Sequence, residues 1–235
     1  MGTQKKLAYE STEPLKTTIK RFCIVVIFSI AFAYIEAAVV VYLRTIFPSD
    51  GFSFPLTDFG TILQQKPLRF TEMGREAATI VLIFTGVWLF GRNRRQRFAY
   101  FLTIFAIWDI FYYVWLKVLI DWPASIMDWD ILFLIPAPWA SAVLYPVLIS
   151  ITMLIFAAAI LYRDARGRPI KVTRADWLVF IIAAVIVVVS FYIPGRHITE
   201  PDYKSYFYLP LFALGHISAI AVFLKCLLKS KSLSE

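Results

Sequence analysis

Charge is scarce in this chain of 235 residues, because Asp, Glu, Lys and Arg make up 17% of it and hydrophobic residues make up 60%. A soluble domain has about 25% charged and about 45–50% apolar residues, so this composition excludes an ordinary soluble protein. The chain also has only two cysteines, Cys23 and Cys226, and two histidines, His197 and His216. These are too few for a disulfide scaffold, a zinc cluster or a histidine-rich metal site.

The common catalytic signatures are missing as well. The sequence contains no P-loop, no GxGxxG, no HExxH and no GxSxG motif. A cation site built from carboxylates alone stays chemically possible, because hard cations accept oxygen ligands without help from His or Cys. The residues therefore identify no cofactor, no metal ligands and no substrate.

The sequence contains instead six apolar stretches of about 20 residues, the length that an α-helix needs to cross a hydrocarbon core of about 30 Å. They cover residues 22–43, 71–90, 98–120, 131–162, 177–193 and 207–228. This pattern predicts an all-α integral membrane protein, a bundle of six transmembrane helices.

The fourth stretch is longer than a span requires and contains Pro136, Pro138 and Pro146. Proline removes a backbone donor and bends or breaks a helix, so we expect span 4 to be broken by these prolines. Broken spans often build binding sites in transporters. The alternative is a kinked helix that follows a segment at the membrane surface.

The connections between the spans differ in charge. Seventeen Lys and Arg residues lie before span 1, in "GRNRRQR", in "RDARGRPIKVTR" and toward the C-terminus, whereas five lie in the opposite connections. Cytoplasmic loops hold an excess of Lys and Arg, so both termini are expected in the cytoplasm. We expect a cytoplasmic N-terminal segment (1–21), a six-span membrane domain (22–228) and a cytoplasmic tail (229–235). The net charge of +8 then reflects topology, and we expect no nucleic-acid partner.

Several polar residues interrupt the spans or stand at their ends. The candidate pocket residues are Glu36, Glu72, Arg75, Glu76, Asp109, Tyr113, Lys117, Asp130 and His216. An Asp or Lys at the bilayer centre costs about 2.5–3.5 kcal/mol on insertion scales, so such residues usually face the bundle interior and have partners. With both termini inside, most of these residues lie in the outer half of the membrane. We predict that Glu36, Arg75 or Glu76, and Asp109 form one polar cluster that opens toward the outer face.

The sequence is compatible with several partners for each of these charged residues. Asp109 and Lys117 lie about 12 Å apart along their helix, so each is expected to pair with another helix. Lys117 could meet Glu36 or Glu76, or it could extend outward to the membrane surface. Glu72 and Glu76 are i,i+4 neighbours, which favours a shared cation or a retained proton.

Each of these residues also has a purely structural interpretation. Glu36 and Asp109 could form buried ion pairs that only hold helices together. "TEMGRE" could be a charged helix start at the membrane surface, and His216 could be a hydrogen-bonded core histidine.

The strings "REAATIVLIF", "WDIFYYVWLK" and "DILFLIPAPW" resemble segments of bacterial membrane proteins, which implies a location in the cell inner membrane. This resemblance implies no activity and no site residue.

Three functions are compatible with these observations. The preferred hypothesis is a proton-coupled transporter of a small solute or ion, with Glu36, Asp109 and Lys117 as a relay. A membrane-embedded enzyme would use Glu72, Glu76 and Asp109 on a lipid or outer-leaflet substrate. A structural subunit of a larger membrane complex would use the charges only to hold its helices. The expected partners are membrane lipid and either a second copy of the chain or a larger membrane complex.

Overall fold

The computed structural model describes residues 13–46 and 66–232, and it confirms an all-α protein with six helices long and apolar enough to cross a membrane. The helices are α1 (Leu15–Ile46), α3 (Lys66–Phe90), α4 (Arg94–Ile120), α5 (Leu144–Ala165), α6 (Arg174–Gly195) and α7 (Leu209–Ser232). Two short strands, β1 (Trp129–Phe133) and β2 (Trp139–Ala142), and a 3-10 helix, η2 (Tyr203–Tyr206), complete the described elements. The protein is therefore a multi-pass membrane protein.

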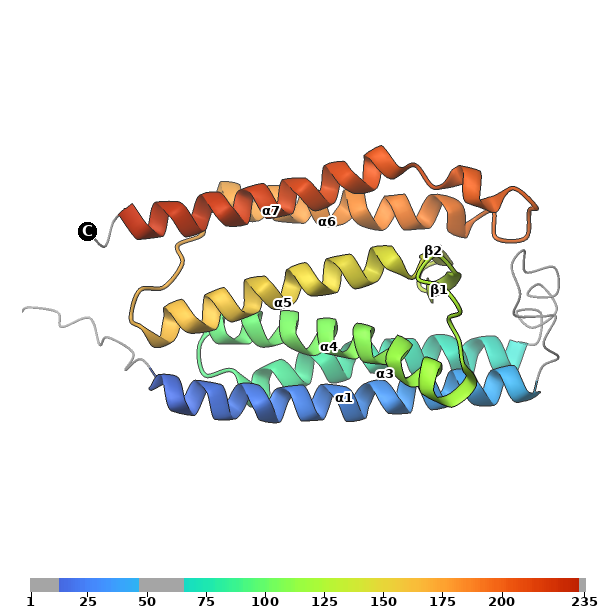
Figure 1. Cartoon of the computed structure of the whole chain (residues 1–235), viewed down its shortest axis with the longest axis horizontal. Coiled ribbons are helices and arrows are strands. Elements are labelled where there is room, and N and C mark those ends of the chain that lie inside the picture. Colours follow the sequence, from blue (N-terminus) through green and yellow to red (C-terminus); the bar gives the residue numbers. More distant parts are fainter. Residues whose placement is uncertain (1–12, 47–65, 233–235) are drawn as a thin grey trace, which may run out of the picture.

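The six helices lie side by side along one direction in two groups (Figure 1). Helices α6 and α7 form a pair, whereas α1, α3 and α5 pack against α4. The bundle has two distinct ends. The basic end holds residues 91–97 and 166–174, the start of α1 and the end of α7, and the hairpin end holds β1 and β2 (Figure 1). Which end faces the cytoplasm stays a prediction.

Local sequence explains where the helices begin and how closely they pack. The Asn93 side chain accepts a hydrogen bond from the Gln96 backbone N–H and so caps α4. Thr173 and Asp176 form a reciprocal capping box at the start of α6. A Cβ on Gly215 of α7 would lie 2.8 Å from a backbone oxygen of α6. A small residue at this position therefore allows α6 and α7 to approach closely.

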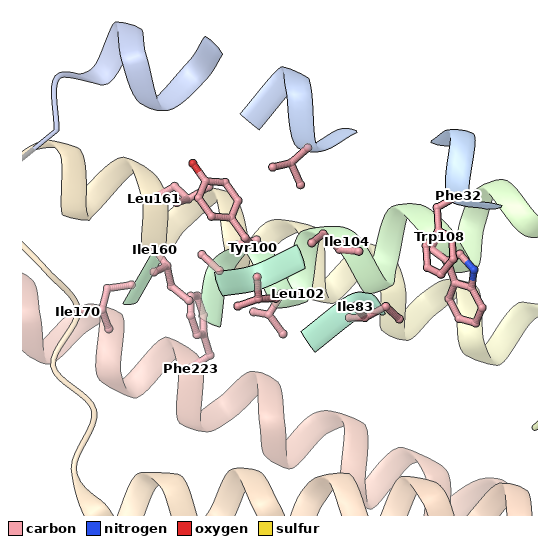
Figure 2. Packing of buried hydrophobic residues seen from close by; sticks show 14 of the residues in the cluster. Phe32, Ile83, Tyr100, Leu102, Ile104, Trp108, Ile160, Leu161, Ile170 and Phe223 are labelled. Carbon is pink, nitrogen blue, oxygen red and sulfur yellow. The ribbon is translucent and has the colours of Figure 1, made fainter. Parts of the chain in front are cut away.

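The main apolar core surrounds α4. Figure 2 shows Tyr100, Leu102 and Ile104 of α4 among Ile160 and Leu161 of α5 and side chains of other helices. Tyr100 and Ile104 are fully buried. The outer faces of the helices expose many large apolar side chains, as expected for surfaces that face lipid. α4 is thus the helix on which the rest of this group is assembled.

The segment between α4 and α5 corrects the prediction for span 4. Residues 131–143, predicted as part of a helix, lie mostly in an antiparallel hairpin that pairs Trp129 with Ala142 and Ile131 with Ala140. Pro136 and Pro138 lie in the turn of this hairpin, so they end a strand rather than break a helix. Pro146 lies in the first turn of α5, where proline removes no helical hydrogen bond. The fourth spanning helix therefore begins at Leu144.

The hairpin connects the two groups of helices. Strand β2 packs against α6, and a Cβ on Gly195 would overlap the Pro138 carbonyl oxygen. On the other side, the Phe133 ring lies 6.1 Å from the Trp108 ring of α4. Trp108 precedes the end of α4 by about 18 Å of helix, so the hairpin reaches well inside the bundle.

Polar contacts at the basic end link α4 to α5 within one group, and α5 to α7 between the two groups. The Arg95 guanidinium donates to the Asp164 carboxylate at 2.7 Å and links the start of α4 to the end of α5. Arg163 of α5 donates to the Ser230 backbone oxygen of α7 at 2.9 Å. The α6–α7 pair is therefore attached to the other helices at both ends of the bundle.

Candidate functional site

A cavity of about 1120 Å³ lies between the two groups of helices. From α4 it is lined by Arg94, Arg95, Phe98, Phe101, Leu102, Phe105, Trp108, Asp109, Tyr112 and Tyr113. These positions recur every three or four residues, so one face of α4 borders the cavity along almost the whole helix. The distance from Arg94 to Tyr113 is about 28 Å of helix, close to the thickness of a hydrocarbon core of about 30 Å.

The opposite wall of the cavity comes from α6, with Trp177 near the basic end and Phe191 near the hairpin end. Helices α5 and α7 meet along one side. The Thr152 hydroxyl lies 2.9 Å from His216 Nε2, and the rings of Phe156 and Phe223 stack at 3.8 Å. His216, a predicted pocket residue, lines the cavity but is also a hydrogen-bonded core histidine.

Near the hairpin end, Arg75 bridges two carboxylates that the sequence placed in the pocket. Arg75 Nη1 donates to Glu36 of α1, and its Nε donates to Glu72 at 3.0 Å. A second hydrogen bond, from Nη2 to Glu72, makes that pair bidentate. The Thr79 hydroxyl donates to the other Glu36 oxygen at 3.2 Å. The side chains of Arg75, Glu36 and Glu72 are 21%, 11% and 17% exposed, so this network is largely shielded from solvent.

Glu76 has a different hydrogen-bond partner from Glu72. Both Glu76 carboxylate oxygens accept the Leu134 backbone N–H of the hairpin, at 2.9 and 3.0 Å. Backbone donors inside a membrane protein need a partner where water is scarce, and Glu76 supplies it. Glu72 is paired with Arg75 and Glu76 with a backbone N–H, and a cation shared by the two carboxylates stays a prediction. In the described ranges, 13–46 and 66–232, no three His, Cys, Asp or Glu side chains gather closely enough to hold a metal ion.

Asp109 lies at the cavity wall and contacts a hydroxyl group rather than a cation. The Ser150 hydroxyl of α5 donates to Asp109 Oδ2 at 2.8 Å. Among the residues that the structure describes, no Lys or Arg pairs with Asp109, and the charge that acts on it most is that of Asp130. The buried-ion-pair interpretation of Asp109 is therefore wrong for the described residues.

Asp130, on β1, is 7% exposed and stands beside Tyr112 and Tyr113. Burial raises the pKa of the Asp130 carboxyl to about 6, although the positive charge of Arg44 acts in the opposite direction. Asp130 Oδ2 has no hydrogen-bond partner within the described protein, and neither have the indole nitrogens of Trp108 and Trp139. All three side chains line the cavity.

Lys117 is the predicted pocket residue that the structure places elsewhere. Its ammonium group pairs with Asp121 at 2.7 Å, and its side chain is 49% exposed. Lys117 does not line the cavity. The prediction that it pairs with another helix is wrong, because α4 ends at Ile120 and the next residue turns back in a left-handed conformation, with φ of 54°. The alternative of an outward-facing Lys117 agrees with its exposure.

The predicted polar cluster thus has two parts on one cavity. Glu36, Glu72 and Arg75 form one network, and Asp109 and Asp130 form a second carboxylate group close to Tyr113. The cluster was predicted without Ser150, Thr79, Tyr112 and Arg44, which contact or act on its members. Hydroxyl groups inside apolar helices are the signal that could have identified Ser150 and Thr79.

Comparisons with protein-family models, curated protein sequences and solved structures found no match to this chain. The geometry of this cavity and the charges along it are therefore the features that indicate its function.

Proposed function

We propose that the protein is a proton-coupled transporter of a small solute or ion, with the cavity between α4 and α6 as its pathway. One observation supports this function most strongly. A cavity about as long as the hydrocarbon core is thick has a carboxylate, Asp109, in its wall, and that carboxylate contacts a hydroxyl group instead of a cation. Ionisable residues inside the membrane often mark ion pathways and proton relays.

The environment of Asp109 gives a physical basis for coupling. An ionised carboxylate away from water is costly unless it is paired, so Asp109 is favoured either with a proton or beside a cation. Because one carboxylate cannot hold both at full strength, a bound proton and a bound cation compete. A solute that binds beside Asp109 therefore displaces a proton, and the two movements become linked.

Polar contacts at both ends of the cavity provide the parts that move during transport. Arg75, Glu36 and Glu72 line it near the hairpin end. Arg95, which also lines the cavity, is held by Asp164 at the basic end. A solute that passes along α4 has to pass both sets of contacts. We propose that they open in turn, with the hairpin end outside, as the distribution of basic residues predicts.

Access from water to the middle of the cavity tests this proposal. A background variant, Cys23→Ser, removes the exposed native thiol and retains the buried Cys226. Single cysteines replace Phe101 or Val187, which line the cavity from α4 and α6. The control is Ile155→Cys, because Ile155 is 60% exposed on the outside of α5, where we expect lipid.

A membrane-impermeant thiol reagent is added to right-side-out and to inverted membrane vesicles. A transporter predicts labelling of both cavity cysteines in both preparations, since the pathway opens to each side, and no labelling of Ile155→Cys in either. Labelling from one side alone contradicts transport, and so does a complete lack of labelling at both cavity positions.

A further inference from the structure

The charges around the hairpin half of the cavity favour a positively charged solute. Five carboxylates but only three arginines line this half. Arg75 is already shared by Glu36 and Glu72, so its charge is compensated. Asp109 is the carboxylate that no described basic residue balances. A cation near Asp109 would reduce this excess of negative charge, whereas an anion would increase it.

Aromatic rings surround the same position. Trp108 and Phe133 lie 6.1 Å apart, Phe133 and Trp139 lie 5.6 Å apart, and the cavity touches all three. Tyr112 and Tyr113 contact each other at 4.9 Å beside Asp130. Aromatic faces attract ammonium groups through the ring quadrupole, most strongly where water is excluded. Carboxylates and aromatic rings in one place are thus suited to an organic cation.

Polar atoms without partners show that this part of the cavity suits a polar group. Asp130 Oδ2 is a buried acceptor that receives no hydrogen bond within the described protein, and Asp130 is 7% exposed. The indole N–H groups of Trp108 and Trp139 are donors in the same situation. Buried polar groups in folded proteins almost always have a partner. An ammonium N–H can donate to Asp130, and an oxygen atom of the solute or of its hydration shell can accept from an indole.

The middle of the cavity is mostly apolar, between the carboxylates at the hairpin end and the basic residues Arg94, Arg95 and Lys171 at the other end. From the position of Asp109 toward the basic end, it is bordered by Phe101 and Phe105 of α4 and by Phe180 and Val187 of α6. A volume of about 1120 Å³ is at the upper end of the range for small-molecule pockets, about 300–1,000 Å³. It therefore has room for an apolar group many times larger than an ammonium head.

From these observations we infer that the transported solute is an organic amine with an apolar body, bound with its ammonium group between Asp109 and Asp130. This inference rests on the proposed transport function and adds the class of solute to it. The protonated amine replaces the proton on Asp109, so the negative charge of the carboxylate is neutralised in both states. The apolar body lies along α4 and α6 toward the basic end.

Three probes that share one phenylalkyl body and have polar groups of different charge test the inference. These are 4-phenylbutylamine, which is a cation at neutral pH, the neutral 4-phenylbutanol and the anionic 4-phenylbutanoate. Their binding to the purified full chain in detergent is measured by calorimetry and by tryptophan fluorescence, since Trp108 and Trp139 line the site. We expect the amine to bind at least ten times more tightly than the alcohol, and the acid to bind most weakly.

Two variants locate the effect. Asp109→Asn should remove the preference for the amine over the alcohol. Asp121→Asn is the matched control, because Asp121 is exposed, pairs with Lys117 and does not line the cavity, so it should keep the preference. Should Asp109→Asn fail to fold, the comparison of three probes with the unmodified protein still decides the matter.

Equal binding of the three probes would overturn the inference, and so would tighter binding of the alcohol or the acid. Such a result leaves transport itself intact if cavity cysteines are labelled from both sides of the membrane. Amine binding together with labelling from one side would instead retain the amine site and overturn transport.

Discussion

Replacement of Arg75 by methionine tests how the hairpin end of the cavity is held together. Methionine keeps a long unbranched side chain but removes the guanidinium group that Glu36 and Glu72 share. The two carboxylates belong to different helices, α1 and α3. Without Arg75 they would face each other with no cation between them, in a position largely shielded from water.

The structure predicts that removing the charge of Arg75 lowers the free energy of unfolding more than removing the charge of Glu36. Loss of one partner of a buried ion pair costs about 3–5 kcal/mol, because the remaining charge stays buried. At about 2–4 °C per kcal/mol for a chain of 150–250 residues, Arg75→Met should lower Tm by about 6–20 °C. Glu36→Gln is milder, since Arg75 retains Glu72, and the loss of a hydrogen bond to a charged group costs about 1.5–3 kcal/mol.

Thermal unfolding of the two purified variants in one detergent, followed by tryptophan fluorescence, measures this asymmetry. The double variant Glu36→Gln/Arg75→Met should regain part of the stability lost in Arg75→Met, because it removes one of the stranded carboxylates. The reasoning is refuted if Glu36→Gln lowers Tm as much as Arg75→Met does, or if Arg75→Met melts like the unmodified protein.

Three further predictions follow from the hairpin end. Gly195→Ala should lower Tm, because its Cβ would overlap the Pro138 carbonyl oxygen, whereas the control Gly74→Ala, with nothing within 4 Å of its Cβ, should melt at the same or a higher temperature. Burial raises the pKa of Asp130 from 3.8 to about 6, so the folded protein retains a proton that the unfolded chain releases. The free energy of unfolding should therefore decrease as the pH rises from about 4 to about 6. Melting curves of Asp130→Asn should lack this part of the decrease. Lys117→Met should leave both Tm and amine binding unchanged, because the Lys117 ion pair is exposed and outside the cavity; a clear loss of either would contradict this placement.

The six helices could be predicted from sequence because a membrane-spanning helix is recognised from one property, an apolar run of about 20 residues. The third stretch, predicted at 98–120, forms α4 from Arg94 to Ile120. The hairpin could not be predicted in this way. "WDILF" and "WASA" are apolar enough to continue a span, and short apolar runs do not distinguish a strand from a buried helix. The prolines were therefore interpreted as breaks within a helix.

The contacts of the candidate residues were harder to predict than their membership of the pocket. Arg75 was expected to meet either Glu36 or Asp109, and it pairs with Glu36. Asp109 was expected to find a charge, but it accepts from Ser150 instead. That choice depends on α5 lying beside α4, and helix adjacency is not readable from one sequence. Glu76 had no predictable partner, because Leu134 lies on the hairpin that the sequence did not indicate.

The most direct test of proton-coupled transport through this cavity is the uptake of a cationic dye against a controlled pH gradient. The protein is reconstituted into liposomes that contain DNA, and the rise in ethidium fluorescence reports its entry. With an acidic interior, outward movement of protons should drive ethidium inward, faster than in protein-free liposomes, and Asp109→Asn should abolish this difference. Uptake that is equal with and without the protein, or that is unaffected by the direction of the pH gradient, would contradict the account.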